Sequence, residues 1–231
     1  MQGLKTDKLS LKAILFDFDG TLARLNIDFT LMRRVVLELI GNYDVPQDGL
    51  ADLFVLEMIE AGGKRLAETR PEDLPAYRNK AYSLIEAIEL DAARQGNLLE
   101  GTRPMLAELQ RCLIRTGVVS RNSGAAIAAI FPDIHNYCNT VIPRELTSHV
   151  KPHPEHLLTA LHALHARPET SAMVGDHPMD IRAGKEVGLL TIGVLTGSSG
   201  PEILGEAAPD IILNSAPDII GLLRRQPLPR S

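Results

Sequence analysis

Leu15-Phe16-Asp17-Phe18-Asp19-Gly20-Thr21-Leu22, close behind the N-terminus, is the most informative stretch of this chain. The apolar run Ala13–Phe16 predicts a buried strand, and it ends abruptly in two carboxylates. On an extended chain Asp17 and Asp19 point to the same side, so their carboxylates need a cation, a proton or a strong ligand between them. The Gly20-Thr21 step that follows lets the chain turn and offers a hydroxyl to the turn or to an anion.

Short apolar runs that end in polar residues recur from Leu98 onward, separated by segments with helical periodicity. We expect strands at 116–120, 140–142, 171–175, 189–194 and 210–213, and helices at 102–113, 123–130, 154–165, 178–187 and 217–223. This alternation predicts an α/β fold with a doubly wound parallel sheet, because parallel neighbours need crossover connections. Ligands of such sheets bind beyond the carboxyl ends of the strands, where Asp17, Ser120 and Asp176 are expected together.

Residues from about 27 to 97, between the first strand and the later strands, have helical periodicity instead. Apolar residues recur at four-residue spacing at Ile27, Leu31, Val35 and Leu39. Further helices are expected around 50–58 and over 74–95, with breaks at Gly62-Gly63 and Arg70-Pro71. We therefore expect three or four helices in a small bundle.

The predicted domains follow from this change of period. Residues 1–23 and 98–231 form an α/β core domain, and residues 24–97 form an inserted helical cap domain. Because the insertion follows the first strand, we expect the cap to act as a lid over the strand ends.

Composition excludes several classes of function. The 231 residues are 45% hydrophobic and 23% charged, as in soluble globular proteins. A formal net charge of -5 without a basic run argues against nucleic acid as a partner. Residues 1–12 lack the apolar core of a signal peptide, and no segment has the 18 or so apolar residues that cross a bilayer. Cys112 and Cys138 form no C-x-x-C pair and are expected to be reduced and buried. We expect a cytoplasmic monomer or homodimer that binds neither nucleic acid nor membrane.

The polar residues at the strand ends have complementary charges. Four acidic residues are expected there: Asp17, Asp19, Asp176 and Asp180. So many carboxylates in one pocket favour a hard cation with oxygen ligands, and Mg²⁺ accepts carboxylates together with water and a substrate phosphate. Lys151 and the Ser120-Arg121-Asn122 turn offer an ammonium, a hydroxyl and amides, which are ligands for an anion. A cation, a lysine and amide donors around one point predict a phosphoryl site.

In its motifs the chain resembles the phosphatases of the haloacid dehalogenase superfamily. That family carries D-x-D-x-T, then a strand ending in Ser or Thr, then a lysine, then G-D-x-x-x-D. This chain has, in the same order, Asp17-Phe18-Asp19-Gly20-Thr21, Val118-Val119-Ser120, Lys151-Pro152-His153-Pro154 and Gly175-Asp176-His177-Pro178-Met179-Asp180. The resemblance, to phosphoglycolate phosphatase-like members with a helical (C1-type) cap, covers essentially the whole chain.

The resemblance implies catalytic roles for the matching positions. Asp17 would be the nucleophile that forms an aspartyl-phosphate, and Asp19 would be the general acid and base. Ser120 would bind a phosphoryl oxygen, and Lys151 would offset the charge of the nucleophile and the phosphoryl group. Asn122 is a candidate for a second phosphate contact.

The resemblance also implies ligands for the cofactor Mg²⁺ and for the phosphate. Asp17, the backbone carbonyl of Asp19 and Asp176 would contact the metal. Asp180 would contact it through water, or would orient Lys151 instead. The Gly20-Thr21 turn would join the phosphate site.

Position 19 discriminates within the family. Members that cleave carbon–halogen or carbon–phosphorus bonds need no acid there, so Asp19 favours hydrolysis of a phosphate ester. The expected function is therefore a Mg²⁺-dependent phosphatase of a small phosphorylated metabolite, a phosphoglycolate-like monoester. The alternatives are a sugar phosphomutase, whose cap keeps water from the aspartyl-phosphate, a pyrophosphatase, or a non-catalytic module that binds a phosphorylated ligand.

Substrate choice is expected to lie in the cap, where the sequence offers fewer signals. Arg33 and Arg34 fit a solvated helix face better than a substrate contact, whereas a loop at 62–65, with Lys64 and Arg65, is a candidate specificity element. Of the histidines, His162 and His165 stand three apart without a neighbouring carboxylate and are expected to be solvated. His177, inside the acidic motif, either tunes the pocket or is an ordinary loop residue.

Overall fold

The computed structural model describes residues 11–224, which divide into two compact units. One unit is Asn26–Gln95; the other joins the chain up to Leu25 with the chain from Gly96 onward. Each boundary lies two residues from the corresponding boundary predicted from the sequence. The predictions for the first ten residues lie outside the described residues.

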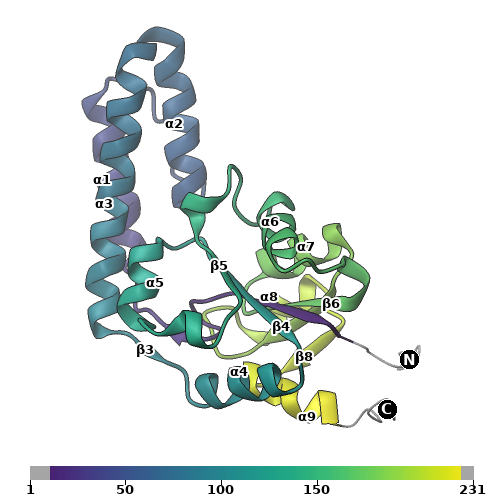
Figure 1. The fold of residues 1–231 in the computed structure, drawn as a ribbon. Coiled ribbons are helices and arrows are strands. Elements are labelled where there is room, and N and C mark those ends of the chain that lie inside the picture. Colours follow the sequence, from purple (N-terminus) through teal and green to yellow (C-terminus); the bar gives the residue numbers. More distant parts are fainter. Residues whose placement is uncertain (1–10, 225–231) are drawn as a thin grey trace. The chain divides into compact units, whose positions relative to one another are not determined.

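A six-stranded sheet forms the centre of the first unit, which we call the core unit (Figure 1). Its strands stand in the order β5 (Thr140–Ile142), β4 (Arg115–Val119), β1 (Ala13–Phe16), β6 (Ser171–Gly175), β7 (Leu190–Val194) and β8 (Ile211–Leu213). Every neighbouring pair is parallel, so all six strands end at the same edge of the sheet. The predicted α/β fold is confirmed, and Asp17, Ser120 and Asp176 each follow directly after a strand.

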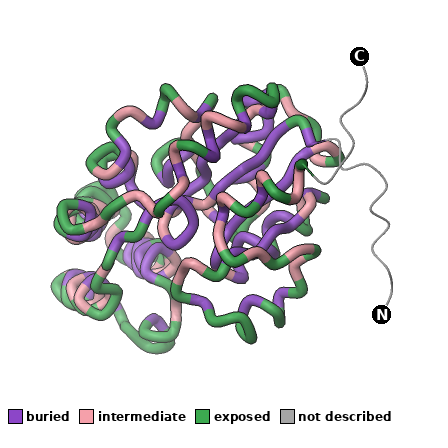
Figure 2. The backbone as a smooth tube through the Cα atoms, turned by 90° about the horizontal axis from the view of Figure 1, so that it is seen from below, coloured by how far each residue is buried: buried purple, intermediate pink, exposed green. Residues whose placement is uncertain are grey.

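Burial on both faces explains the apolar sequence of β1, whose four residues are fully buried. Ala13 and Leu15 pack with Met173 of β6 against the helices α6 (Glu155–Ala163) and α7 (Pro178–Val187). The helix α4 (Thr102–Arg111) packs on β4 and on α9 (Ile219–Arg224), away from α6 and α7 (Figure 1). The central strands are buried along their length, while the outer helices alternate between buried and exposed residues (Figure 2).

Several elements of the core unit were not predicted. A short antiparallel pair, β2 (Ala23–Arg24) with β3 (Asn97–Leu98), lies where the chain leaves and re-enters the core unit. The helix α8 (Pro201–Glu206) was not predicted either. The helix α5 (Gly124–Ile130) was predicted correctly, with Ser123 as its N-cap. The prediction that both cysteines are buried is wrong for Cys112, which is exposed.

Three helices form the second unit, which we call the helical unit. They are α1 (Phe29–Asn42), α2 (Val55–Thr69) and α3 (Leu74–Gln95), and each packs on the other two (Figure 1). The predicted bounds of α3 are confirmed, as is the break at Arg70-Pro71. The residues before Val55 form a loop, so the second predicted helix begins too early. The buried face of α1 is displaced by one position from the predicted stripe and carries Met32, Val36, Leu39 and Ile40.

The predicted break at Gly62-Gly63 is wrong, because both glycines lie inside α2. A Cβ on Gly62 would lie 2.5 Å from Tyr77 Oη and 3.0 Å from the Ile40 side chain. These glycines therefore let α2 approach its neighbours closely. Among the described residues, no helix is both long and apolar enough to span a membrane.

Candidate active site

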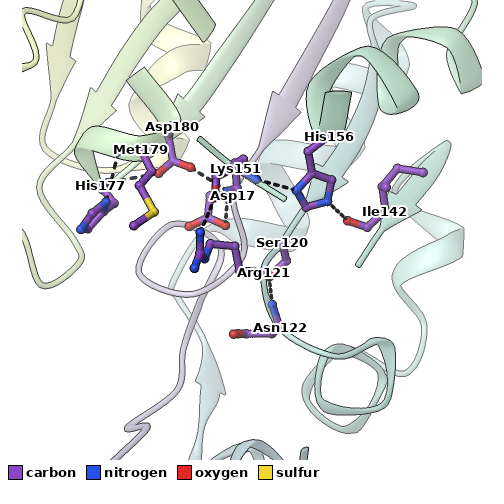
Figure 3. Close-up of polar contacts among 10 residues, drawn as sticks. All are labelled: Asp17, Ser120, Arg121, Asn122, Ile142, Lys151, His156, His177, Met179 and Asp180. Atoms are coloured by element: carbon purple, nitrogen blue, oxygen red, sulfur yellow. Dashed lines mark hydrogen bonds and ion pairs between the residues drawn. The ribbon is translucent and has the colours of Figure 1, made fainter. Parts of the chain in front are cut away.

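Lys151 is the centre of the polar cluster at the strand ends. Its side chain is 2% exposed, and its Nζ lies 2.8 Å from Asp17 Oδ1 and 2.6 Å from Asp180 Oδ1 (Figure 3). Burial disfavours the ammonium, but the two carboxylates outweigh this effect and raise the pKa of Lys151. The lysine is therefore a fixed positive charge aimed at two acidic side chains.

Carboxylates outnumber this ammonium. Oxygens of Asp17, Asp176 and Asp180 lie within 4.8 Å of one another. Burial raises the pKa of Asp17, and burial together with its acidic neighbours raises the pKa of Asp176 to about 8. Buried carboxylates that share one lysine are costly without a further cation. The all-oxygen donor set fits Mg²⁺, which prefers carboxylate ligands.

Asp176 is closely enclosed by backbone. Gly20 has a φ of 82°, and a Cβ there would lie 2.6 Å from the Asp176 carboxyl carbon. The Ser198 N–H donates to Asp176 Oδ2 at 3.2 Å, and Thr196 Oγ1 donates to the Gly20 carbonyl at 2.6 Å. The turn at Gly20 is thus tied to the loop after β7, a loop whose role was not predicted from the sequence.

Asp19 is not one of the three carboxylates whose oxygens lie within 4.8 Å of one another, but it interacts electrostatically with Asp17 and Asp176. Its Oδ1 accepts a hydrogen bond of 2.7 Å from the Leu25 N–H, and burial raises the pKa of Asp19 to about 7. The side chain is therefore held in place and can carry or release a proton near neutral pH. The structure does not bring the Asp19 carboxylate into the acidic cluster, and contact of its carbonyl with a metal stays a prediction.

The predicted anion ligands lie at the ends of β1 and β4. Ser120 is 1% exposed, and its Oγ accepts a hydrogen bond of 3.2 Å from the Asn122 N–H (Figure 3). Asn122 Nδ2 and Thr21 Oγ1 are buried without a hydrogen-bond partner. Because such buried polar atoms are costly, they indicate that a polar ligand belongs beside them.

The acidic motif also starts a helix. His177 is the N-cap of α7, and its Nδ1 accepts a hydrogen bond of 3.1 Å from the Met179 N–H. Asp180 Oδ2 accepts from the His177 N–H at 3.1 Å, while its Oδ1 contacts Lys151. Two roles were left open for Asp180. Its direct contact with Lys151 supports the role in which Asp180 orients that lysine. His177 therefore has a structural role as the N-cap of α7, which the sequence analysis missed.

Two further residues hold the backbone of Lys151 and were not predicted. His156 is fully buried; its Nδ1 accepts from the Lys151 N–H at 3.2 Å, and its Nε2 faces the Ile142 carbonyl at 2.9 Å (Figure 3). The Arg121 guanidinium donates to the Lys151 carbonyl. Burial and the charge of Lys151 lower the pKa of His156 to about 3, so the imidazole is neutral. The apolar spacing of α6, with Leu157, Ala160 and Leu161 buried, was the available signal that His156 faces the core.

The residues proposed for specificity lie in the helical unit, and the predicted loop at 62–65 is wrong because it is part of α2. Arg65 donates to the carbonyls of Pro46 at 2.7 Å and Asp48 at 2.9 Å. Arg33 donates to the Ala51 carbonyl at 2.5 Å and also to that of Leu53. Both guanidiniums therefore stabilise the loop between α1 and α2.

The other residues discussed as specificity or metal candidates in the sequence are exposed to solvent. Arg34 and Lys64 are exposed. His162 and His165 are exposed as well, so the prediction that they are solvated is confirmed.

Comparison with known proteins assigns the family. Residues 14–194 match the model of the haloacid dehalogenase-like hydrolases. The chain belongs to this family. A putative pyrophosphatase PpaX of Clostridium perfringens is 31% identical over 209 residues, which are 85% of this chain and 89% of that protein. The N-acetylmuramic acid 6-phosphate phosphatase of Pseudomonas putida is 26% identical over 199 residues, 84% of this chain and 87% of that protein.

A solved structure extends the match to the fold. CbbY from Rhodobacter sphaeroides, crystallised in complex with phosphate, is 25% identical with a TM-score of 0.60, covering 90% of this chain and 96% of that chain. The predicted superfamily is confirmed. In this haloacid dehalogenase-like hydrolase, Asp17, Lys151, Asp176 and Asp180 lie together at the carboxyl edge of the sheet, with Asp19 and Ser120 on the same edge.

Proposed function

We propose that this protein is a Mg²⁺-dependent phosphatase that hydrolyses a phosphate monoester of a small metabolite. The observation that carries the proposal is the position of Lys151 Nζ, 2.8 Å from Asp17 and 2.6 Å from Asp180, with Asp176 beside them. A lysine aimed at a nucleophilic carboxylate, next to carboxylates that suit a cation, has the composition of a phosphoryl-transfer site. Membership of a hydrolase family and the names of the relatives support the same conclusion.

In the first step, a carboxylate oxygen of Asp17 attacks the phosphorus of the ester. The bond between phosphorus and the leaving oxygen breaks, and Asp19 gives its proton to the alkoxide that departs. Lys151 and the Ser120 hydroxyl bind the phosphoryl oxygens, and Asn122 Nδ2 gains the partner that it lacks. The product of this step is an alcohol and an acyl phosphate on Asp17.

In the second step, water attacks the phosphorus of the acyl phosphate. Asp19, now ionised, takes a proton from the water. The bond between phosphorus and the Asp17 oxygen breaks, which regenerates the Asp17 carboxylate and releases inorganic phosphate. A pKa of Asp19 near 7 suits both directions of proton transfer at neutral pH.

Mg²⁺, when bound, supplies positive charge that offsets the phosphoryl oxygens and the buried carboxylates. Asp17 and Asp176 would hold it with their carboxylates, and Asp19 with its backbone carbonyl. Asp180 would contribute through water at most, because it already contacts Lys151 and the His177 amide.

Hydrolysis of an aryl phosphate, measured with Mg²⁺ and with excess chelator, tests the proposal. We expect Asp17→Asn to lower kcat by about 10⁴-fold or more, since removal of a nucleophile abolishes the covalent route. Asp91→Asn, which changes an exposed aspartate of α3, is the matched control and should retain activity. Hydrolysis that persists in Asp17→Asn, or without divalent ions, would refute the mechanism.

The second candidate is hydrolysis of pyrophosphate, because the 31% identical relative carries the name of a putative pyrophosphatase. A panel with phosphoglycolate, pyrophosphate, N-acetylmuramic acid 6-phosphate, sugar phosphates and nucleoside monophosphates separates the candidates by kcat/KM. A phosphomutase would leave phosphate on a sugar instead of releasing it, and a binding module would turn over none of the panel. The role of the helical unit as a lid, the cytoplasmic location and the monomeric or homodimeric state stay predictions.

A further inference from the structure

A second group of possible metal ligands lies on the segment that carries Lys151. His149, His153 and Glu155 each offer a ligand atom, and the three atoms lie within 4.8 Å of one another. The group shares no residue with the acidic cluster at the strand ends. The side chains of His149, His153 and Glu155 are 62%, 51% and 36% exposed, so an ion can reach them from solvent.

The distances in this group bracket those of a tetrahedral site. His149 Nδ1 lies 2.6 Å from Glu155 Oε2, and His153 Nδ1 lies 4.0 Å from the same oxygen. Ligand atoms at about 2.0–2.1 Å from a tetrahedral Zn²⁺ stand about 3.3 Å from each other. One distance has to lengthen and the other to shorten, each by less than about 1 Å, which exposed side chains allow.

Hydrogen bonds from the backbone already orient the carboxylate. Glu155 Oε1 accepts from the Ser148 N–H at 3.2 Å, so Oε2 remains for the imidazoles. Thr147 Oγ1 donates to the His149 carbonyl at 3.0 Å and holds the backbone of that histidine. His153 Nδ1 accepts from the Glu155 N–H at 3.2 Å, so this nitrogen carries a lone pair that an ion would take over. The first two hydrogen bonds use no ligand atom, and partners of this kind commonly strengthen metal binding. The third is replaced when an ion binds His153 Nδ1.

We propose that His149, His153 and Glu155 bind one borderline divalent ion such as Zn²⁺, with water in the remaining position. Two imidazoles and a carboxylate favour zinc and its neighbours in the first transition row over Mg²⁺. The bound ion joins the residues two positions before and two positions after Lys151 to the first turn of α6. The site goes beyond the proposed phosphatase activity, because none of its ligands takes part in the phosphoryl site.

Titration with Co²⁺ in the presence of excess Mg²⁺ tests this site. Mg²⁺ fills the oxygen-only acidic cluster, and Co²⁺ in a tetrahedral site with nitrogen ligands gives intense visible bands. We expect one Co²⁺ per chain, displaced by one Zn²⁺. His149→Ala, His153→Ala and Glu155→Gln should each weaken binding by at least about tenfold. His162→Ala and His165→Ala, in and just beyond the last turn of α6, are matched controls at the opposite end of that helix and should leave the affinity unchanged.

Three results would overturn the proposal: no Co²⁺ bound, only weak six-coordinate bands that Mg²⁺ removes, or equal affinity in the His149→Ala/His153→Ala double variant. The first would mean that His149 and Glu155 form an ion pair only. Thermal unfolding followed by circular dichroism checks that each variant is folded. In the wild-type chain, paramagnetically shifted imidazole resonances on addition of Co²⁺ provide a measurement that needs no variant, and their absence would equally refute the site.

Discussion

The acidic cluster of the core unit and the surface of the helical unit hold their charged side chains in different ways. In the core unit, Lys151 and Asp180 are at most 2% exposed and face each other and Asp17. In the helical unit, Arg65 is directed to backbone carbonyls of a loop, and the ion pair of Arg78 with Glu60 is about half exposed. Charges of the first kind have been taken out of water at a high cost, whereas those of the second kind remain solvated.

Under the proposed function, this difference separates functional charges from structural ones. Buried carboxylates that outnumber their cationic partner imply a ligand which is part of the finished site. Guanidiniums that satisfy loop carbonyls at the surface need no ligand, and removing one costs little. Four single substitutions test this distinction, from the largest expected effect to the smallest.

Lys151→Met gives the largest expected effect on stability. The variant leaves Asp17, Asp176 and Asp180 buried without their ammonium, so the free energy of unfolding in metal-free buffer should fall by about 3–5 kcal/mol. Urea denaturation measures the change. Lys64→Met, an exposed lysine of α2, is the matched control and should stay within about 0.5 kcal/mol of wild type. A loss below about 1 kcal/mol in Lys151→Met would mean that these carboxylates are not held against one another.

The sequence predicted the positions of Asp17 and Asp176 because strand ends are a strong constraint, whereas Asp19 was predicted in the same cluster and is not part of it. An apolar run that stops at an aspartate, as at Asp17 and Asp176, must present that aspartate at the edge of a parallel sheet. The position of Lys151 depends on a loop, and its contact with Asp180 could be predicted only through the family resemblance. The contact of Arg121 with the Lys151 carbonyl has no sequence signature, since it joins segments 30 residues apart. For His156 the apolar spacing of α6 indicated a buried side chain but not its contact with the Lys151 N–H.

The helical unit was harder to predict for a physical reason. Glycine is a weak helix former, so a Gly-Gly pair normally indicates a break. At Gly62 the tertiary contact with Tyr77 overrides this preference, because only a residue without a side chain fits. Likewise, the roles of Arg33 and Arg65 depend on where the loop between α1 and α2 places its carbonyls, which no periodicity in the sequence encodes.

Gly62→Ala tests whether the contact with Tyr77 requires a glycine in α2, and it should have the second largest effect on stability. The added methyl group meets Tyr77 Oη, which donates a buried hydrogen bond of 3.0 Å to the Ile59 carbonyl. Overpacking of this kind typically costs about 1–3 kcal/mol, more than the gain in helix propensity. Gly205→Ala in α8, where nothing lies within 4 Å of the new Cβ, is the control and should stabilise by up to about 1 kcal/mol. Chemical denaturation that shows Gly62→Ala to be stabilising would mean that packing against Tyr77 does not require a glycine at this position of α2.

The next prediction concerns the pH dependence that His156 gives to the core unit. Its pKa is lowered from 6.5 to about 3, so the native imidazole stays neutral while the unfolded chain takes up a proton below about pH 6.5. The stability that depends on this group is therefore complete above pH 6.5 and is lost as the pH falls toward 3. Between pH 7 and pH 5 the loss should be about 1–2 kcal/mol.

His156→Gln isolates this contribution, because Asp19 and Asp176, whose pKa values are raised, titrate in both proteins. The difference in unfolding free energy between wild type and His156→Gln, measured by urea denaturation from pH 7 to pH 5, should shrink as the pH falls. His162→Gln, an exposed histidine of the same helix, should show no such change. A difference that stays constant with pH would mean that His156 is not held neutral by its buried contacts.

Arg65→Ala should have the smallest effect and addresses the helical unit directly. Loss of two exposed hydrogen bonds to the Pro46 and Asp48 carbonyls should lower the free energy of unfolding by about 0.5–1 kcal/mol. Because the guanidinium is engaged with the loop, KM for a phosphorylated substrate should stay within about twofold of wild type, a difference of about 0.4 kcal/mol in binding. Steady-state kinetics measures this, with Arg94→Ala at the exposed end of α3 as the control. A tenfold rise in KM confined to Arg65→Ala would show that this arginine binds substrate, and the distinction between buried functional charges and exposed structural ones would then fail in the helical unit.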